Sequence, residues 1–314
     1  MKILFVFSGN KPSGISAIIK NQGNSLFDHG IEIDFFPIIG KGVVSYLRHI
    51  PVLKKLLKSH RFDIVHAHYS FSAYAASLAG AKPLVVSLMG SDVNNSWPNA
   101  YVIKLFAYVF QWKSIIVKSE DLKLKSGFKN AIVIPNGVDL NRFKPLDNAA
   151  CKQKLLWEND KKYILFAADP HRREKNFFLA KEAFQKLGNE SVLMQVLLNV
   201  PYKDIPVWIN AAKVVILTSF WEGSPNVIKE ALACNRPIVS TDVGDVRILM
   251  ENVEGCFIAK PDSVDIAGKI SQAMHFENAP NGRQRIIDLG LELNTIAAKI
   301  IDVYHSVLRG SSCQ

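Results

Sequence analysis

Short apolar runs alternate with segments of helical spacing along the whole chain. In the first half the apolar runs fall at residues 2–7, 32–38, 63–68, 83–88, 114–117 and 131–134. Runs such as Leu84-Val85-Val86 are apolar on both faces, as in strands of a parallel sheet that helices cover on each side. Residues 15–27 have helical spacing, and Gly30 follows as a helix stop. The pattern predicts an α/β domain with a parallel sheet.

The same alternation starts again after residues 145–160, which are polar and lack a strand pattern. The second set of apolar runs lies at residues 163–167, 192–198, 214–218, 238–241 and 256–258. We therefore predict two doubly wound, Rossmann-like domains, 1–148 and 149–314, facing each other across a cleft. The last helix is expected to pack back on the first domain. Ligands of open parallel sheets bind beyond the carboxyl ends of the strands, so candidate chemistry is expected there.

One segment leads from a predicted strand through a short loop into a predicted helix. Its sequence is SFWEGSPNVIKEA, from Ser219 to Ala231. Ser224 is expected to be the N-cap and Pro225 the first helical residue, which is a favoured helix start. The unpaired amides of such a helix start suit a diphosphate. The candidate donor-binding residues around this helix start are Gly223, Ser224, Pro225, Asn226 and Val227.

Two glutamates accompany this helix start. Glu230 lies on the same side of the helix as Asn226, where a carboxylate can accept hydrogen bonds from two vicinal ribose hydroxyls. Glu222, in the loop before the helix, can do the same for a sugar hydroxyl nearer the diphosphate. The alternative is that both are solvated surface carboxylates.

A basic cluster follows the strand at 163–167. Arg172, Arg173 and Lys175 lie beyond the carboxyl end of that strand, where they are well placed to bind phosphate. An ordinary solvated run of charges remains the alternative.

Together these segments resemble the GT-B retaining glycosyltransferases of family 4, the glycosyl transferases group 1. Glu222 and Glu230 match the family's E-x7-E motif, and the stretches at 135–139, 143–145, 231–233 and 236–244 match its other signatures. The resemblance implies that Glu230 holds the donor ribose and Glu222 the donor sugar, and that Lys175 and an arginine clamp the pyrophosphate. The family arginine position holds Pro170, so Arg172 or Arg173 is expected to substitute. Met89 stands where many relatives have a histidine that contacts the donor sugar.

The first half supplies further candidates. Gly14, in the loop after the first strand, is a candidate for close backbone approach to the donor, or an ordinary turn residue. His68 shares a strand face with His66 and is a candidate near the acceptor, although a packed histidine is commoner. Asp92 is a candidate for an acceptor hydroxyl, with helix capping as its alternative. The two histidines could be metal ligands, but the sequence shows no third ligand for such a site.

The charge is unevenly distributed. The net charge is +10, and residues 1–148 hold 18 Lys+Arg against 9 Asp+Glu. Residues 45–62 also form a basic amphipathic pattern, which fits either an anionic membrane surface or an ordinary surface helix. Nothing resembles a nucleic-acid-binding module, so we predict no nucleic-acid partner. Four scattered cysteines, an apolar start too short for a signal peptide and the absence of a spanning segment predict a cytoplasmic protein. The basic first half and the resemblance together suggest that it is peripheral on the inner face of the cell membrane.

We therefore predict an enzyme of the hexosyltransferase kind, which moves a sugar from a nucleoside diphosphate sugar to an acceptor hydroxyl with retention. The expected acceptor is a lipid-linked sugar or glycan in cell-envelope polysaccharide or glycolipid synthesis. No cofactor and no metal are expected, because there is no Asp-x-Asp pair and the basic cluster can stabilise the leaving diphosphate. The alternatives are a GT-B nucleotide-sugar epimerase and a non-catalytic sugar-nucleotide-binding scaffold subunit.

Overall fold

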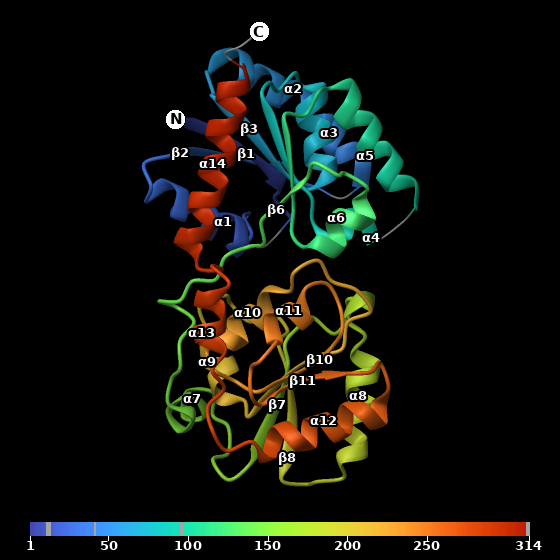
Figure 1. The fold of residues 1–314 in the computed structure, drawn as a ribbon, viewed down its shortest axis with the longest axis vertical. Helices are drawn as coiled ribbons and strands as arrows, with labels where there is room; N and C mark the ends of the chain where they lie inside the picture. Colours follow the sequence, from blue (N-terminus) through green and yellow to red (C-terminus); the bar gives the residue numbers. More distant parts are fainter. Residues whose placement is uncertain (11–13, 41, 95–96, 312–314) are drawn as a thin grey trace. The chain divides into compact units, whose positions relative to one another are not determined.

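The chain folds into two α/β units. The computed structural model describes residues 1–10, 14–40, 42–94 and 97–311. Unit 1 comprises Met1–Gly137 together with the C-terminal segment from Leu293, and unit 2 comprises Val138–Glu292. Figure 1 shows the two units with the C-terminal helix returning to the first. Each has its own parallel sheet, as the sequence pattern predicts.

Unit 1 is built on a six-stranded sheet in the order β2-β1-β3-β4-β5-β6, with every neighbouring pair parallel. The strands are β1 (Lys2–Ser8), β2 (Glu32–Ile38), β3 (Ile64–His68), β4 (Leu84–Ser87), β5 (Ser114–Val117) and β6 (Ile132–Val133). The helices are α1 (Ala17–Phe27), α2 (Gly42–Ser59), α3 (Ser70–Leu78), α4 (Gly90–Asn94), α5 (Trp97–Val109), α6 (Glu120–Ser126) and α14 (Leu293–Ser311). Helices α2, α3 and α5 contribute to one core on one face of the sheet.

Unit 2 is built on a five-stranded parallel sheet in the order β11-β10-β9-β7-β8. Its strands are β7 (Lys162–Phe166), β8 (Val192–Val196), β9 (Val214–Leu217), β10 (Ile238–Thr241) and β11 (Cys256–Ala259). The helical segments are α7 (Asn148–Lys154), the 3₁₀ turn η1 (Arg173–Lys175), α8 (Phe177–Leu187), α9 (Ile205–Ala211), α10 (Asn226–Ala233), α11 (Val246–Met250), α12 (Ser263–His275) and α13 (Gly282–Asp288). Helices α8 and α12 pack on the sheet through an apolar core.

The division between the units differs from the predicted boundary after residue 148. The structure divides after Gly137, because the segment that follows is tied into unit 2. The Arg283 guanidinium donates to the carbonyls of Leu140 and Phe143, over 2.9 and 2.8 Å, and the Phe143 side chain is fully buried. Polar composition did not mark this boundary, because these hydrogen bonds hold a segment that precedes the polar stretch at 145–160.

Helix α14 completes unit 1. The Ser25 hydroxyl in α1 donates to the carbonyl of Leu293 over 3.1 Å, and the fully buried Tyr304 hydroxyl lies 2.6 Å from Nδ1 of His66 in β3. The last helix therefore packs against both a helix and a central strand of its unit. Among the described residues, no helix has the combined length and apolarity needed to cross a bilayer.

Candidate donor site in unit 2

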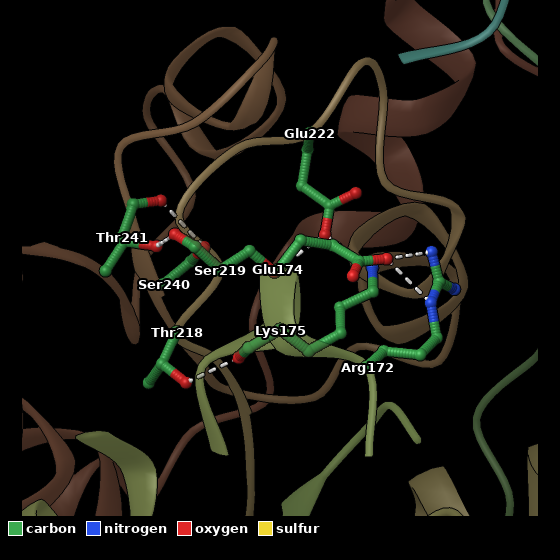
Figure 2. A network of polar contacts seen from close by, with 8 residues as sticks. All are labelled: Arg172, Glu174, Lys175, Thr218, Ser219, Glu222, Ser240 and Thr241. Atoms are coloured by element: carbon green, nitrogen blue, oxygen red, sulfur yellow. Dashed lines mark hydrogen bonds and ion pairs between the residues drawn. The ribbon is translucent and has the colours of Figure 1, made fainter. Parts of the chain in front are cut away.

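Hydrogen bonds join three loops at the carboxyl edge of the unit 2 sheet. Strand β9 lies between β7 and β10, so the loops that follow these strands meet at that edge. The Thr218 hydroxyl, just after β9, donates to the carbonyl of Lys175 over 3.2 Å, and the amide of Phe220 donates to the carbonyl of Glu174 over 2.9 Å. The Thr241 hydroxyl, at the end of β10, donates to the carbonyl of Ser219 over 2.8 Å. Figure 2 shows the contacts of Thr218 and Thr241 in this network.

The network brings together two residues that the sequence predicts separately. Lys175 Nζ lies 2.5 Å from Oε1 of Glu222, and the Ser219 hydroxyl donates to the same carboxylate oxygen over 2.7 Å. Both side chains are largely withdrawn from solvent, with 11% of Lys175 and 13% of Glu222 exposed. Such a charge-assisted pair fixes the position of both groups. The predicted phosphate-binding lysine and the predicted sugar-binding glutamate therefore lie in direct contact (Figure 2).

The two candidate arginines have different surroundings. The Arg172 Nε donates to Oε1 of Glu174 over 2.7 Å, and Arg172 is 55% exposed. Burial favours the neutral form of Glu174, but a backbone hydrogen bond and Arg172 outweigh it, so the pKa of Glu174 is lowered. Arg173 begins the 3₁₀ turn and is exposed. The choice between the two arginines as the diphosphate contact stays a prediction.

The start of α10 differs from the predicted capping by one residue. Helix α10 begins at Asn226, its N-cap is Pro225, and no side chain caps it. The prediction of Ser224 as N-cap and Pro225 as first helical residue is therefore wrong. The Ser224 hydroxyl instead accepts from the buried Lys229 Nζ over 3.1 Å. The first amides of α10 thus have no capping side chain.

A fixed turn supports the loop before α10. Gly244, after β10, has a φ of +60°, and a Cβ there would lie 2.5 Å from the carbonyl oxygen of Gly223. A residue other than glycine would be strained at this φ and would also collide with the backbone of the loop. Close backbone packing therefore positions the loop that carries Glu222, Gly223 and Ser224.

Two adjacent residues of α10 are buried and perturbed. Burial raises the pKa of Glu230 to about 7, although the Tyr202 hydroxyl donates to its Oε1 over 3.1 Å. Lys229 is fully buried, and burial lowers its pKa to about 8 despite the negative charges of Asp245 and Glu230. Perturbed pKa values of this kind cluster at functional sites. The sequence analysis did not identify Tyr202, Lys229 or Asp245; the position of Tyr202 after β8 was the one available signal for it.

The first turn of α10 also holds an unsatisfied acceptor. Asn226 Oδ1 is buried and makes no hydrogen bond among the described residues. Asn226 stands four residues before Glu230, so both lie on one side of the helix. Val227, the next residue of this turn, is also half-buried. Buried polar atoms normally find a partner, so Asn226 is a candidate ligand contact.

The unit 1 candidates are placed as follows. Gly14 has a φ of +71°, which favours glycine, and no atom lies within 4 Å of a Cβ built there; residues 11–13 of its loop lie outside the described ranges. The rings of His68 and His66 stack with centroids 4.2 Å apart, so the two share a face as predicted. His68 is only 2% exposed, and burial followed by the charge of Lys118 lowers its pKa to about 3.

Asp92 has a structural task in unit 1. It is 1% exposed, and its carboxylate accepts from the amides of Ser70, at the start of α3, over 2.9 Å and of Met89 over 2.5 Å. Burial raises its pKa to about 6 against these hydrogen bonds. Both carboxylate oxygens are thus engaged by backbone amides. Within the described ranges, no group of three or more His, Cys, Asp or Glu could hold a metal ion.

The two parallel-sheet units and the candidate site in unit 2 define a GT-B protein, and comparison with known proteins agrees. Residues 16–142 match the family described as "Glycosyltransferase Family 4", and residues 158–275 match "Glycosyl transferases group 1". The chain belongs to this family of GT-B glycosyltransferases.

Three similar proteins illustrate the match. The "UDP-Gal:alpha-D-GlcNAc-diphosphoundecaprenol alpha-1,3-galactosyltransferase" of Escherichia coli is 25% identical over 304 residues, covering 82% of this chain and 78% of that protein. The structure of sucrose-phosphate synthase from Thermosynechococcus elongatus has a TM-score of 0.82 at 15% identity, covering 99% and 100% of the two chains. The structure of Anabaena Alr3699/HepE in complex with UDP and glucose has a TM-score of 0.75 at 20% identity, covering 98% and 100%.

Proposed function

We propose that this chain transfers a sugar from a nucleoside diphosphate sugar to a hydroxyl of a lipid-linked acceptor in cell-envelope glycan synthesis. The observation that carries this proposal is the Lys175–Glu222 pair, held at the carboxyl edge of the unit 2 sheet beside the uncapped start of α10. A cation and free helix amides at one edge suit a diphosphate, and a carboxylate beside them suits a sugar hydroxyl.

The neighbouring residues of α10 would hold the nucleoside. Glu230 and Asn226 present a buried carboxylate and a buried amide oxygen that makes no hydrogen bond among the described residues. Two vicinal ribose hydroxyls can donate to such acceptors, and the Tyr202 hydroxyl would orient the Glu230 carboxylate from behind. The donor would therefore place its ribose on α10 and its diphosphate over the helix start.

Electrostatics would lower the barrier to transfer. As the bond from the anomeric carbon to the diphosphate breaks, negative charge develops on the leaving oxygen. Lys175, an arginine of the 172–173 pair and the amides of α10 would stabilise that charge without a bound metal or cofactor. The acceptor oxygen would form the new bond to the anomeric carbon, and its proton would pass to the leaving diphosphate oxygen. We propose retention of the anomeric configuration on the basis of the family resemblance.

The acceptor is proposed from the relatives and from the charge distribution. The Escherichia coli relative is named for a diphosphoundecaprenol-linked acceptor. The basic first half of this chain is consistent with a peripheral enzyme on the inner, cytoplasmic face of a membrane that holds such a lipid.

Calorimetric titration of UDP, GDP, ADP and CMP tests the donor site. We expect one of the nucleoside diphosphates to bind the wild type, and Glu230→Ala to weaken that binding about tenfold or more, which is roughly 1.4 kcal/mol. Glu190→Ala is the matched control, because Glu190 is exposed and precedes β8 at the opposite edge of the sheet. Binding of no nucleotide, or equal binding by Glu230→Ala, would contradict the proposed site.

A further inference from the structure

Helix α5 of unit 1 is apolar on two opposite faces. Ile103 is 1% exposed and packs in the unit 1 core together with Phe106, Ala107 and Phe110. The other side carries a row of exposed apolar side chains at the spacing of a single helix face: Tyr101, Val102, Leu105, Tyr108 and Val109. Leu105 is 60% exposed and Tyr108 is 85% exposed. A surface helix normally has polar residues on this side, so the row indicates contact with something apolar.

Helix α2 adds a second apolar and basic surface. Leu53 is fully buried in the same core, whereas Val43, Val44, Leu47 and Val52 are each more than half exposed. The exposed basic residues Arg48, Lys54, Lys55 and Lys58 lie among and after them. Because α2, α3 and α5 pack into one core on the same side of the sheet, α2 and α5 both lie on that face of unit 1 (Figure 1).

This face lacks acidic side chains. Helices α2, α3 and α5 contain no Asp or Glu. Asp92, in α4, is 1% exposed and therefore contributes no surface charge. Within the described ranges, no ion pair neutralises Arg48, Lys54, Lys55 or Lys58. The face thus combines apolar rows with an uncompensated positive charge.

We propose that this face docks on the surface of an anionic lipid bilayer, with the exposed row of α5 entering the interface and the basic residues of α2 contacting the headgroups. Apolar side chains together with lysines and arginines, and tyrosines at the level of the headgroups, are what such an interface accommodates. The positive charge favours anionic lipid over a second copy of the chain, because two copies of this face would bring like charges together. The inference rests on the proposed function, since it gives that enzyme access to a lipid-linked acceptor.

Vesicle flotation tests the docking surface. We expect the wild type to float with vesicles of phosphatidylcholine and phosphatidylglycerol, and at least tenfold less with phosphatidylcholine alone. Leu105→Gln combined with Tyr108→Gln should weaken binding to the anionic vesicles at least tenfold. Lys54→Gln combined with Lys55→Gln should reduce the preference for anionic lipid. The control is Phe178→Gln combined with Val264→Gln, two exposed apolar residues of unit 2, which should bind like the wild type.

Three results would overturn the docking surface. The wild type could remain unbound, the α5 double variant could float like the wild type, or sedimentation could show a dimer that the α5 variant dissociates. Nucleotide calorimetry on the same samples separates this inference from the proposed function. If a variant binds the donor nucleotide normally but fails to float, the docking surface is affected and the donor site is intact. If the wild type binds no nucleotide, the proposed function itself is contradicted.

Discussion

The affinity for the donor should depend on pH through Glu230. Burial raises the pKa of this carboxyl to about 7, and its proposed task, to accept from two ribose hydroxyls, requires the ionised form. With that pKa, about one molecule in eleven is ionised at pH 6 and about ten in eleven at pH 8. Binding of the donor should therefore weaken about tenfold, or roughly 1.4 kcal/mol, when the pH falls from 8 to 6.

The measurement is calorimetric titration of the preferred nucleoside diphosphate sugar at half-unit steps of pH. The sugar conjugate is used because a terminal phosphate of a free diphosphate itself titrates near pH 6. Glu230→Gln is the matched variant, since it keeps the size of the side chain and removes its titration. We expect weaker binding by Glu230→Gln and a flat pH profile. A flat profile for the wild type, or the same slope in both proteins, would refute the assignment of Glu230 to the ribose.

The same pKa has a consequence for stability. The folded-state pKa of Glu230 lies above its ordinary value of 4.5, so the folded protein binds more protons than the unfolded chain between about pH 4.5 and 7. Ionisation of Glu230 therefore lowers the free energy of unfolding as the pH rises through that window, by an amount on the order of 3 kcal/mol. Glu230→Gln should remove this loss, which denaturation at pH 5 and pH 8 would reveal.

Three further predictions concern single positions inside one unit or the other. Lys229→Met should destabilise unit 2 by about 2 kcal/mol in guanidinium denaturation, because the fully buried Lys229 would no longer donate its hydrogen bond to Ser224. An unchanged denaturation midpoint would contradict this. Gly244→Ala should weaken donor binding and cost more stability than Gly188→Ala, since both have positive φ but only Gly244 would collide with Gly223; equal effects would contradict the role of that close approach. His68 has a folded pKa of about 3, below its ordinary 6.5, so stability should be lost as the pH falls through that range, by up to about 1.4 kcal/mol per unit. His68→Leu should flatten this acid slope, and an identical slope would contradict the burial argument.

The strands of both units could be predicted from the sequence. All eleven predicted strands are present, and their ends differ by at most two residues from the observed ones. Buried parallel strands leave a clear pattern because apolar residues occupy both faces. The division of the chain was less predictable, since hydrogen bonds from Arg283, more than 130 residues away, attach the segment after Val138 to unit 2.

The site was predictable in its residue types and less so in its contacts. The strand-loop-helix pattern identified Glu222 and Lys175 separately, but nothing in the sequence indicated a 2.5 Å pair between residues 47 positions apart. The helix start was misplaced by one residue, and Ser224, the expected cap, instead accepts from Lys229, which is buried at a position that could equally have faced solvent. Such tertiary contacts override local capping preference, and a single sequence does not reveal them.

The central claim is that Lys175 acts on the diphosphate of a sugar donor at the carboxyl edge of the unit 2 sheet. The most direct test is a single transfer assay, with the preferred nucleotide sugar and a diphosphate-linked lipid acceptor, followed by mass spectrometry of the product. We expect the wild type to form product and Lys175→Met to lose at least a hundredfold in kcat, about 2.7 kcal/mol. The control Lys162→Met, at the opposite end of β7, should retain full activity. Equal rates for Lys175→Met and the wild type, or no transfer by the wild type with any donor, would contradict the account.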